Sequence, residues 1–355
     1  IESLSPVIFI IKKSLIIFTF IVFFISTNNS FSQEKLFDDY GLITLMYHRF
    51  EENKYPSTNI QIQDFINHVE MIKKNNLSFI NPKNFEVSIK ERKKEKKILL
   101  TIDDAFSSFY QNAWPILKKN RIPFILFVST REVGKFNYMT WEQIQEISKE
   151  DFVHIGNHSH THEYLADYEI SFIKKDIKKS MSILKKKLGY KSVFFAYPFG
   201  EYSLDFKNII KDFGFKYAFG QHSGVVDESK DFFELPRFPI NEKYGELKRF
   251  NTLLNTLPLK FKKATPEEKY INNLTNPPKV NIDFFENIKN LNLINCYSNE
   301  GNRWRKSKIN FLNNFSIEIK LEEKFTTERG RINCSIREAN NTYRWLGLQF
   351  VVSEN

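Results

Sequence analysis

The chain has 355 residues, which is enough for about two domains that each bury a hydrophobic core. Hydrophobic residues make up 41% and charged residues 26%, which excludes a disordered, collagen-like or multi-spanning protein, and the two cysteines exclude a cysteine-rich scaffold. The net charge of +10 is spread along the chain without a basic tail, so we interpret it as a lysine-rich solvated surface and expect no nucleic-acid partner.

The amino terminus has the pattern of a secretory signal peptide. Lys12 and Lys13 precede an apolar run from Leu15 to Ile25, and the small-residue pattern Ser30-Phe31-Ser32 follows it. The run is shorter than the ~20 residues that span a membrane comfortably.

We therefore expect residues 1–32 to be removed and the mature protein to begin near Gln33. An uncleaved anchor, with membrane contact through residues 7–26, is the alternative. Both predict an exported protein that works in the periplasm, in the cell envelope or outside the cell.

From residue 41 to about residue 264, apolar strand patterns alternate with amphipathic helix patterns, which predicts parallel β/α units in a barrel or an open sheet. The expected strands are Gly41–His48, Ile98–Ile102, Pro123–Val128, Phe152–Gly156, Ser192–Tyr197 and Lys216–Phe219. The helices expected between them are Gln61–Asn75, Ser107–Lys119, Trp141–Ser148, Ile170–Leu188 and Leu204–Phe213.

After about Thr265 the pattern changes to short alternating runs, which predicts a small antiparallel β domain over residues 276–355. The expected strands are Val280–Phe285, Leu293–Tyr297, Ser316–Leu321, Arg331–Arg337 and Tyr343–Val352.

Two features of this domain remain open in the sequence. In an exported protein Cys296 and Cys334 either form a disulfide or stay as two buried thiols. Its aromatic residues either stack on sugar rings or form the core of a small sandwich, and we favour the core. These residues are Tyr297, Trp304, Tyr343 and Trp345.

Two adjacent carboxylates, Asp103 and Asp104, follow the apolar run Ile98–Ile102. Polar groups at the carboxyl ends of parallel strands are where β/α folds build their sites. Side chains of neighbouring strand residues point to opposite faces, so one carboxylate can bind a metal while the other handles a proton. An Asx turn that caps the next helix is the alternative.

Three of the seven histidines lie within five residues, in His158-Ser159-His160-Thr161-His162, directly after another expected strand. Histidines at positions i and i+4 in a turn can converge on one cation, and a carboxylate from a neighbouring strand would complete a His/His/Asp site. A surface histidine cluster is the alternative. Pro-containing strand ends follow at Tyr197-Pro198-Phe199-Gly200 and Leu235–Pro239.

Taken together, these motifs resemble the polysaccharide deacetylase, or NodB-homology, family of metal-dependent carbohydrate esterases, over roughly residues 41–240. Thr101-Ile102-Asp103-Asp104 is similar to the family's Thr-Phe-Asp-Asp, and His158–His162 to its His-[Ser/Thr]-x-x-His. Leu45-Met46-Tyr47-His48 and Tyr138–Trp141 resemble exported deacetylases of the poly-N-acetylglucosamine type.

The resemblance implies a deformed (β/α) barrel of about seven strands and a hydrolase that removes N-acetyl groups from a polysaccharide or oligosaccharide containing N-acetylglucosamine. Asp104, His158 and His162 would hold one divalent metal ion, expected to be zinc, with nickel, cobalt or manganese as alternatives. Asp103 would be the general base, and the backbone N–H of Phe199 would help to hold the oxyanion.

The chain also departs from the family pattern. Ala196 stands where the family has the arginine that orients the base, so we expect Arg237 to supply the guanidinium. The family's usual Leu-x-His is missing near the end of the barrel, which leaves His222 and His48 as candidates for the general acid.

Two other functions remain open at this point. The missing acid and arginine would suit a carbohydrate-binding barrel that has lost turnover. His158-Ser159-His160 also resembles the His-x-His of amidohydrolases, although that motif belongs on the first strand of a barrel.

Overall fold

The computed structural model describes residues 40–90, 95–286, 288–338 and 342–353. The expected signal segment, residues 1–32, lies outside the described residues. No helix in the described part of the chain is long and apolar enough to cross a membrane.

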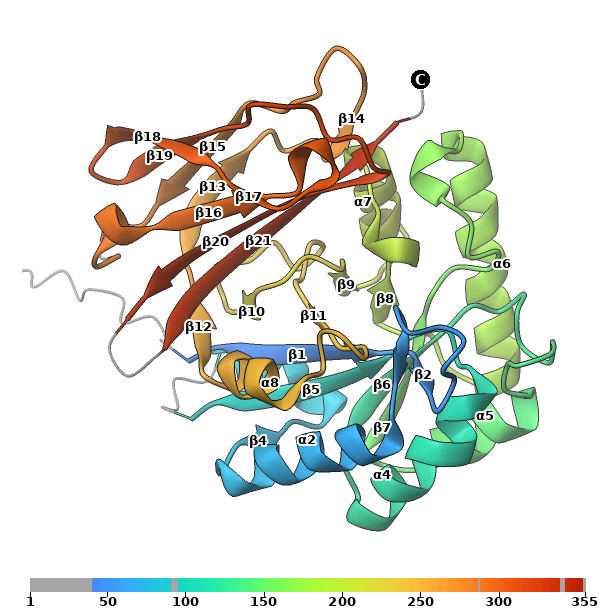
Figure 1. The fold of residues 1–355 in the computed structure, drawn as a ribbon. Helices are drawn as coiled ribbons and strands as arrows, with labels where there is room; N and C mark the ends of the chain where they lie inside the picture. Colours follow the sequence, from blue (N-terminus) through green and yellow to red (C-terminus); the bar gives the residue numbers. More distant parts are fainter. Residues whose placement is uncertain (1–39, 91–94, 287, 339–341, 354–355) are drawn as a thin grey trace, which may run out of the picture. The chain divides into compact units, whose positions relative to one another are not determined.

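A curled sheet forms the first two thirds of the described chain (Figure 1). Six parallel strands lie side by side in chain order, and a seventh, β10, pairs antiparallel with the free edge of β1. They are β1 (Leu42–Tyr47), β5 (Lys97–Ile102), β6 (Phe124–Val128), β7 (Val153–Asn157), β8 (Phe194–Ala196), β9 (Tyr217–Phe219) and β10 (Val225–Val226). The expected deformed barrel of about seven strands is confirmed.

The segment Leu235–Pro239 bridges the two sides of the curled sheet. Leu235 pairs with Phe219 at the end of β9, and β11 (Phe238–Pro239) pairs in parallel with β1. Arg237 lies between these two pairings, and its side chain is completely buried. The short strands β2 (Arg49–Phe50) and β3 (Asn59–Ile60) pair with each other in a separate sheet, and β4 (Ser78–Phe79) pairs with β5.

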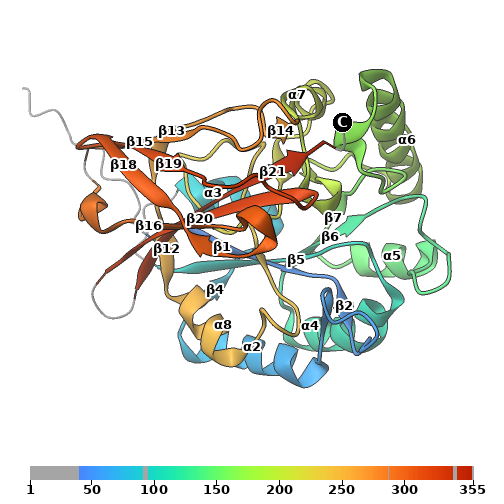
Figure 2. The same ribbon diagram turned by 45° about the horizontal axis from the view of Figure 1, so that its top comes forward.

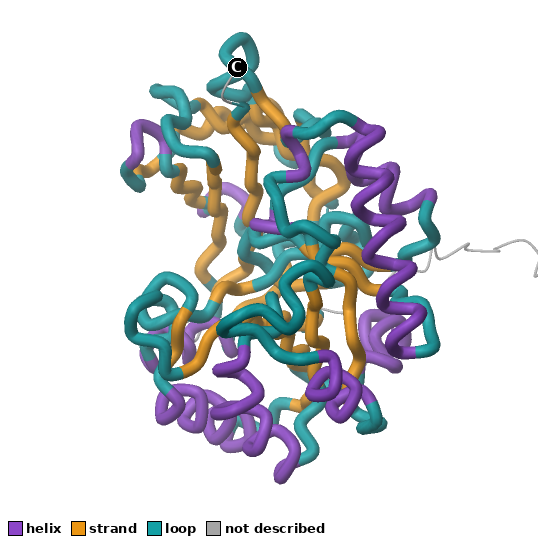
Figure 3. Tube along the Cα trace, turned by 90° about the vertical axis from the view of Figure 1, so that its right-hand side faces the viewer, coloured by secondary structure: helices purple, strands orange, loops and turns teal. Residues whose placement is uncertain are grey.

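Helices cover the outside of this sheet (Figure 3). They are α2 (Ile62–Lys74), α3 (Phe85–Lys90), α4 (Trp114–Asn120), α5 (Trp141–Ser148), α6 (Ile170–Leu188), α7 (Leu204–Asp212) and α8 (Leu247–Leu254). Every residue of β1, β5 and β6 is buried, because these strands are covered on both faces, which explains their continuous apolar runs. The sequence pattern missed α8, and a π-helical turn, Phe109–Ala113, replaces the start of the expected helix at Ser107.

The β-rich C-terminal part contains two sheets (Figure 2). One has the order β12–β21–β20–β16–β17, with β14 also on β21, and the other has the order β13–β15–β19–β18. Their bounds are β12 (Thr256–Pro258), β13 (Phe261–Thr265), β14 (Tyr270–Ile271), β15 (Val280–Phe284), β16 (Asn295–Ser298), β17 (Arg305–Lys306), β18 (Lys308–Asn313), β19 (Ser316–Lys320), β20 (Arg329–Arg337) and β21 (Tyr343–Val352). The sheets thus take in strands that precede residue 276.

Alternation along β20 builds the core of this part, since its residues are buried at every second position from Gly330 to Ile336. Cys296 on β16 lies directly opposite Cys334 on β20, and the two form a disulfide. Of the two states that the sequence left open, the structure has the disulfide.

The strand β21 also contacts the barrel. Leu346 pairs with Gly224, and the ring of Trp345 packs edge-on against Phe238, with 5.8 Å between the ring centres. The described residues between 40 and 353 therefore form one compact unit, and side chains from both parts can line the same cleft.

Candidate metal centre and active site

The two adjacent carboxylates, Asp103 and Asp104, lie in a turn directly after strand β5 rather than in the strand. Strand β5 ends at Ile102, and Asp104 and Ala105 follow in the left-handed conformation, with φ of 73° and 55°. The expected alternation along a strand is therefore wrong in its detail, although Asp103 and Asp104 do have different surroundings. A left-handed residue other than glycine costs about 1–2 kcal/mol, which indicates a conformation imposed by the surrounding structure.

The loop after β7 carries the histidines, and its polar groups hold it in shape. The side chain of Asn157 accepts a hydrogen bond from the N–H of Ser159 (2.9 Å), and the hydroxyl of Ser159 accepts one from the N–H of His162 (3.0 Å). Ser159 and His162 are also left-handed, with φ of 68° and 54°. No helical turn forms in this loop, and these bonds hold its backbone in this conformation.

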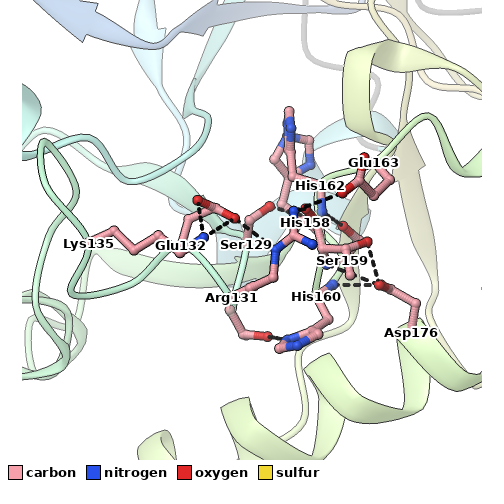
Figure 4. Close-up of polar contacts among 12 residues, drawn as sticks. Ser129, Arg131, Glu132, Lys135, His158, Ser159, His160, His162, Glu163 and Asp176 are labelled. Atoms are coloured by element: carbon pink, nitrogen blue, oxygen red, sulfur yellow. Dashed lines mark hydrogen bonds and ion pairs between the residues drawn. The ribbon is translucent and has the colours of Figure 1, made fainter.

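Asp176 on α6 accepts hydrogen bonds from the same loop and holds it in place (Figure 4). One carboxylate oxygen accepts from the N–H of His160 (2.7 Å), and the other accepts from the N–H and the hydroxyl of Thr161 (3.0 and 2.6 Å). Asp176 was not predicted from the sequence. The pattern that could have indicated it is an acidic side chain on the apolar face of a helix, between Ile173 and Ile177, where an unpaired carboxylate would be costly.

His160 points away from the two expected ligands, since its Nδ1 lies 2.8 Å from the hydroxyl of Thr130. The His-x-His pair of an amidohydrolase is therefore not formed, and the loop follows β7 rather than the first strand of the sheet. The structure does not support that alternative.

Asp104, His158 and His162 do converge. The Oδ1 atom of Asp104 lies 3.1 Å from Nε2 of His162 and 3.4 Å from Nε2 of His158. All three ligand atoms lie within 4.8 Å of one another.

A hydrogen bond orients one of the two imidazoles. Nδ1 of His158 lies 2.7 Å from the carbonyl of Ala196 and donates to it, which directs Nε2 towards Asp104. Although burial would raise the pKa of Asp104, the two imidazoles hold it well below the usual value, so the group is a carboxylate. Its buried Oδ1 makes no hydrogen bond among the described residues. This donor set fits a divalent metal ion.

Asp103 is paired with Arg237. Oδ1 of Asp103 lies 2.7 Å from Nη1 of Arg237, and both side chains are completely buried. The guanidinium also donates to the hydroxyl of Thr101 and to the carbonyl of Gly220 (3.2 and 2.9 Å). Burial would raise the pKa of Asp103, but Arg237, His158 and His48 together outweigh this effect and lower it. The second oxygen, Oδ2, has no hydrogen-bond partner among the described residues and lies 3.9 Å from Nε2 of His48.

The two candidates for the general acid have different surroundings. His48 lies beside Asp103, and burial lowers its pKa while the carboxylates of Asp103 and Asp104 oppose that effect. Burial, together with the ammonium groups of Lys269 and Lys230, lowers the pKa of His222 to about 3. Among the described residues, His222 shows no side-chain hydrogen bond or ion pair to Asp103 or Asp104.

The turn Pro198–Gly200 carries Phe199, which has a φ of 57°, and its ring stacks on Tyr164 with 4.1 Å between centres. Gly200 follows with a φ of 72°, and a Cβ there would lie 2.4 Å from the backbone nitrogen of Gln221. Gln349 on β21, which is buried, donates to the carbonyls of Phe199 and Gly200 (3.3 and 3.2 Å). The C-terminal sheet thus holds the turn in place.

A cleft of about 720 Å³ contains this centre and is lined by both parts of the chain. Asp104, His162 and Phe199 lie on the barrel side, while Tyr297 and Trp304 come from the C-terminal part. These two aromatic side chains are 45% and 49% exposed. The core role favoured from the sequence is therefore wrong for them.

Comparison with known proteins shows which family this chain resembles. Residues 90–218 match the family model described as polysaccharide deacetylase. A poly-beta-1,6-N-acetyl-D-glucosamine N-deacetylase of Staphylococcus epidermidis is 27% identical over 194 residues, which cover 50% of this chain and 67% of that protein. The protein of the same name from Staphylococcus aureus is 27% identical over 198 residues, covering 52% and 68%.

Solved structures show the same fold. IcaB from Ammonifex degensii matches with a TM-score of 0.56 and 25% identity, covering 61% of this chain and 97% of that one. The Streptococcus pyogenes deacetylase PplD, solved with acetate, matches with a TM-score of 0.53 and 22% identity, covering 57% and 94%. The resemblance expected from the motifs is confirmed.

Proposed function

We propose that this chain, which is related to the polysaccharide deacetylases and shares their hydrolase class, removes N-acetyl groups from a polymer of N-acetylglucosamine with the help of a divalent metal ion. The observation that carries the proposal is the convergence of Asp104, His158 and His162 beside a buried, charged Asp103. The poly-N-acetylglucosamine deacetylases among its relatives support the substrate class.

Asp104 and the Nε2 atoms of His158 and His162 would hold the ion. Zinc suits two imidazoles and one carboxylate, and nickel, cobalt and manganese are the alternatives. Once bound, such an ion acts as a Lewis acid towards the acetamide carbonyl and lowers the pKa of water towards ~7.

Asp103 is the general base of the proposed reaction. Oδ1 is held by Arg237, whereas Oδ2 has no hydrogen-bond partner in the part of the chain that the structure describes and can take a proton from the attacking water. Because Arg237 fills the other side of the carboxylate, the base keeps one orientation. Its positive charge also keeps Asp103 ionised before the reaction.

The backbone N–H of Phe199 is proposed to hold the negative oxygen of the tetrahedral intermediate. The left-handed turn sets the direction of this N–H, so a phenylalanine in the family's tyrosine position keeps the function. Gln349 is then a positioning residue, because it fixes the two carbonyls of the same turn.

For the general acid we propose His48 in preference to His222. Its Nε2 lies 3.9 Å from Asp103 Oδ2 and lines the same cleft as Asp104 and His162, so it can pass a proton to the departing nitrogen. His222 also lines the cleft, but burial and the nearby lysines lower its pKa to about 3 and so disfavour the protonated form that an acid needs.

We further propose that the enzyme is exported. The amino-terminal pattern of residues 1–32 supports this, as do relatives that act on an N-acetylglucosamine polymer. The Cys296–Cys334 disulfide is of the kind that persists in oxidising compartments. The only partner that we propose is the substrate, an N-acetylated polysaccharide.

Removing the metal tests the proposed function. Dialysis against a chelator should abolish acetate release from N-acetylglucosamine oligomers, and one of zinc, nickel, cobalt or manganese should restore it. The Asp104→Asn variant should bind less metal, because a charged ligand is lost, whereas Glu267→Gln at an exposed site should keep its metal content. Carbohydrate binding without acetate release under any metal would instead favour the catalytically impaired barrel.

A second prediction concerns Gln349. Replacement by methionine keeps the volume but removes both hydrogen bonds to the Phe199 turn, which are each worth about 1 kcal/mol. The bond that Gln349 accepts from Arg331 is lost as well. We expect kcat for a neutral oligomer to fall about 10-fold with metal content nearly unchanged, because the oxyanion contact is disturbed while the metal ligands are not. Initial-rate kinetics and metal analysis measure this. Loss of thermal stability with an unaltered kcat would show that Gln349 is purely structural.

A further inference from the structure

We infer that the cleft contains a second binding subsite, formed by Arg249 and Arg331 around Tyr244, which binds a negatively charged carboxylate or phosphate group on the polysaccharide. The inference rests on the proposed function, since it names the class of polymer that the same cleft accepts: an N-acetylated polysaccharide that also carries acidic groups.

The three residues come from separate parts of the chain and line the same cleft. Arg249 lies on α8 and Arg331 on β20, and both line the cleft together with Tyr244. The guanidinium of Arg249 lies over the ring of Tyr244, 4.8 Å from its centre. The cluster therefore joins the barrel side of the cleft to the C-terminal sheet.

Both arginines have few partners in the protein. Arg249 donates one hydrogen bond, from Nη1 to the carbonyl of Tyr244, and Arg331 donates one from Nε to the side chain of Gln349 (3.3 Å). A guanidinium has five N–H donors. Neither arginine has a carboxylate oxygen within 4.0 Å among the described residues, in contrast to Arg329 next to them, which is paired with Glu201 and Glu328.

The charges that line the cleft are also unequal. Lys243, Arg249, Arg329 and Arg331 line it, whereas Asp104 in the metal centre is its one carboxylate among the described residues. Burial lowers the pKa of Arg249 and of Arg331, and Arg329 lowers the latter further. Glu201 and Tyr244 oppose this effect but do not remove it for Arg331.

A half-buried guanidinium without a counter-charge is costly, and an oxyanion that accepts two N–H bonds from it is the group that best relieves this cost. A neutral sugar hydroxyl can accept a hydrogen bond, but it brings no negative charge. The deacetylated product carries an ammonium group, which the same arginines repel. The cluster thus favours an acidic, acetylated chain over its product.

The test compares oligomers of N-acetylglucosamine of one length in three forms: neutral, oxidised at C6 to carboxylates, and phosphorylated at C6. With the full chain and its metal, we expect kcat/KM for at least one charged form to exceed that of the neutral form about 10-fold, and the preference to shrink as salt is added. The charged form that is preferred identifies the group.

Variants locate the effect. Arg249→Gln and Arg331→Gln should each lower the ratio of charged to neutral kcat/KM about 10-fold, while Arg249→Lys should keep part of it. The ratio cancels any disturbance of Gln349 that the Arg331 variant causes, since this acts on both substrates. Arg121→Gln is the matched control, because it removes an equal charge at an exposed site paired with Asp151, and it should leave the ratio unchanged.

Equal kcat/KM for neutral and charged oligomers would overturn the inference and leave the proposed function intact. An unchanged ratio in both arginine variants would overturn it as well. If the chain hydrolyses none of the oligomers with any metal, the proposed function fails, and calorimetric binding of the same oligomers decides about the subsite. Tighter binding of a charged form, lost in Arg249→Gln, would support it, and equal binding would overturn it.

Discussion

The Asp103→Asn variant is expected to lose about 10²–10⁴-fold in the rate of deacetylation while it keeps its metal. An amide cannot accept the proton of the attacking water, and at ~1.4 kcal/mol per tenfold the loss corresponds to about 3–5 kcal/mol in the activation barrier. Metal should stay bound, because the three ligand atoms belong to Asp104, His158 and His162. Metal content and acetate release of the purified variant measure both effects.

The control for the Asp103→Asn prediction is the corresponding variant of the neighbouring residue, Asp104→Asn. Asp104→Asn should lose metal, so the two variants differ in what they lose. If Asp103→Asn lost its metal while Asp104→Asn kept it, the assigned roles would be inverted. If both kept metal and activity, the active site would lie elsewhere. Unfolding of Asp103→Asn must be measured in parallel, since the variant leaves Arg237 buried without its counter-charge.

The Arg237→Ala variant is expected to lose both stability and activity. Arg237 is completely buried and pairs with Asp103 at 2.7 Å, and removing one partner of a buried pair typically costs 3–5 kcal/mol because the other charge stays behind. The freed Asp103 also loses its fixed orientation and its depressed pKa, so the rate should fall at least 10-fold. Urea unfolding measures the first effect and acetate release the second.

Two further variants make the Arg237 result interpretable. Arg237→Lys keeps the charge and should recover part of the rate, which a purely steric role would not predict. Arg121→Ala removes an exposed pair with Asp151, and the free energy of unfolding should change by less than about 1 kcal/mol. An Arg237→Ala variant with a rate within a few-fold of the parent would refute the assignment of Arg237 as the group that orients the base.

Much of the candidate site was predictable because its signals are local. Mostly buried strands precede Asp103 and His158, and each functional motif follows directly where such a strand ends. Parallel strands place these ends at one edge of the sheet, so residues 54 positions apart in the chain meet at Asp104 and His158. The sequence motifs and this topology together predicted the cluster.

Other features had no local signal. The short strands β10, β11, β12 and β14 depend on pairing with distant segments, and two- or three-residue strands carry no periodicity of their own. The helix α8 is different, since its buried Phe250, Leu253 and Leu254 stand at helical spacing. Tyr297 and Trp304 follow patterns that suit a core as well as a surface, and their exposure depends on which sheet face meets the cleft. The contact between Gln349 and the Phe199 turn joins residues 150 positions apart.

By itself, the sequence determined the β/α order, the disposition of Asp104, His158 and His162 at strand ends, and the charge of the chain. Only the tertiary structure decided that Arg237 reaches Asp103, that His48 rather than His222 lies beside it, and that Arg249 and Arg331 line one cleft. The physical reason is that periodicity and motifs act between neighbouring residues. Which side chains share a buried space depends on how the sheet curls and how β21 packs against it.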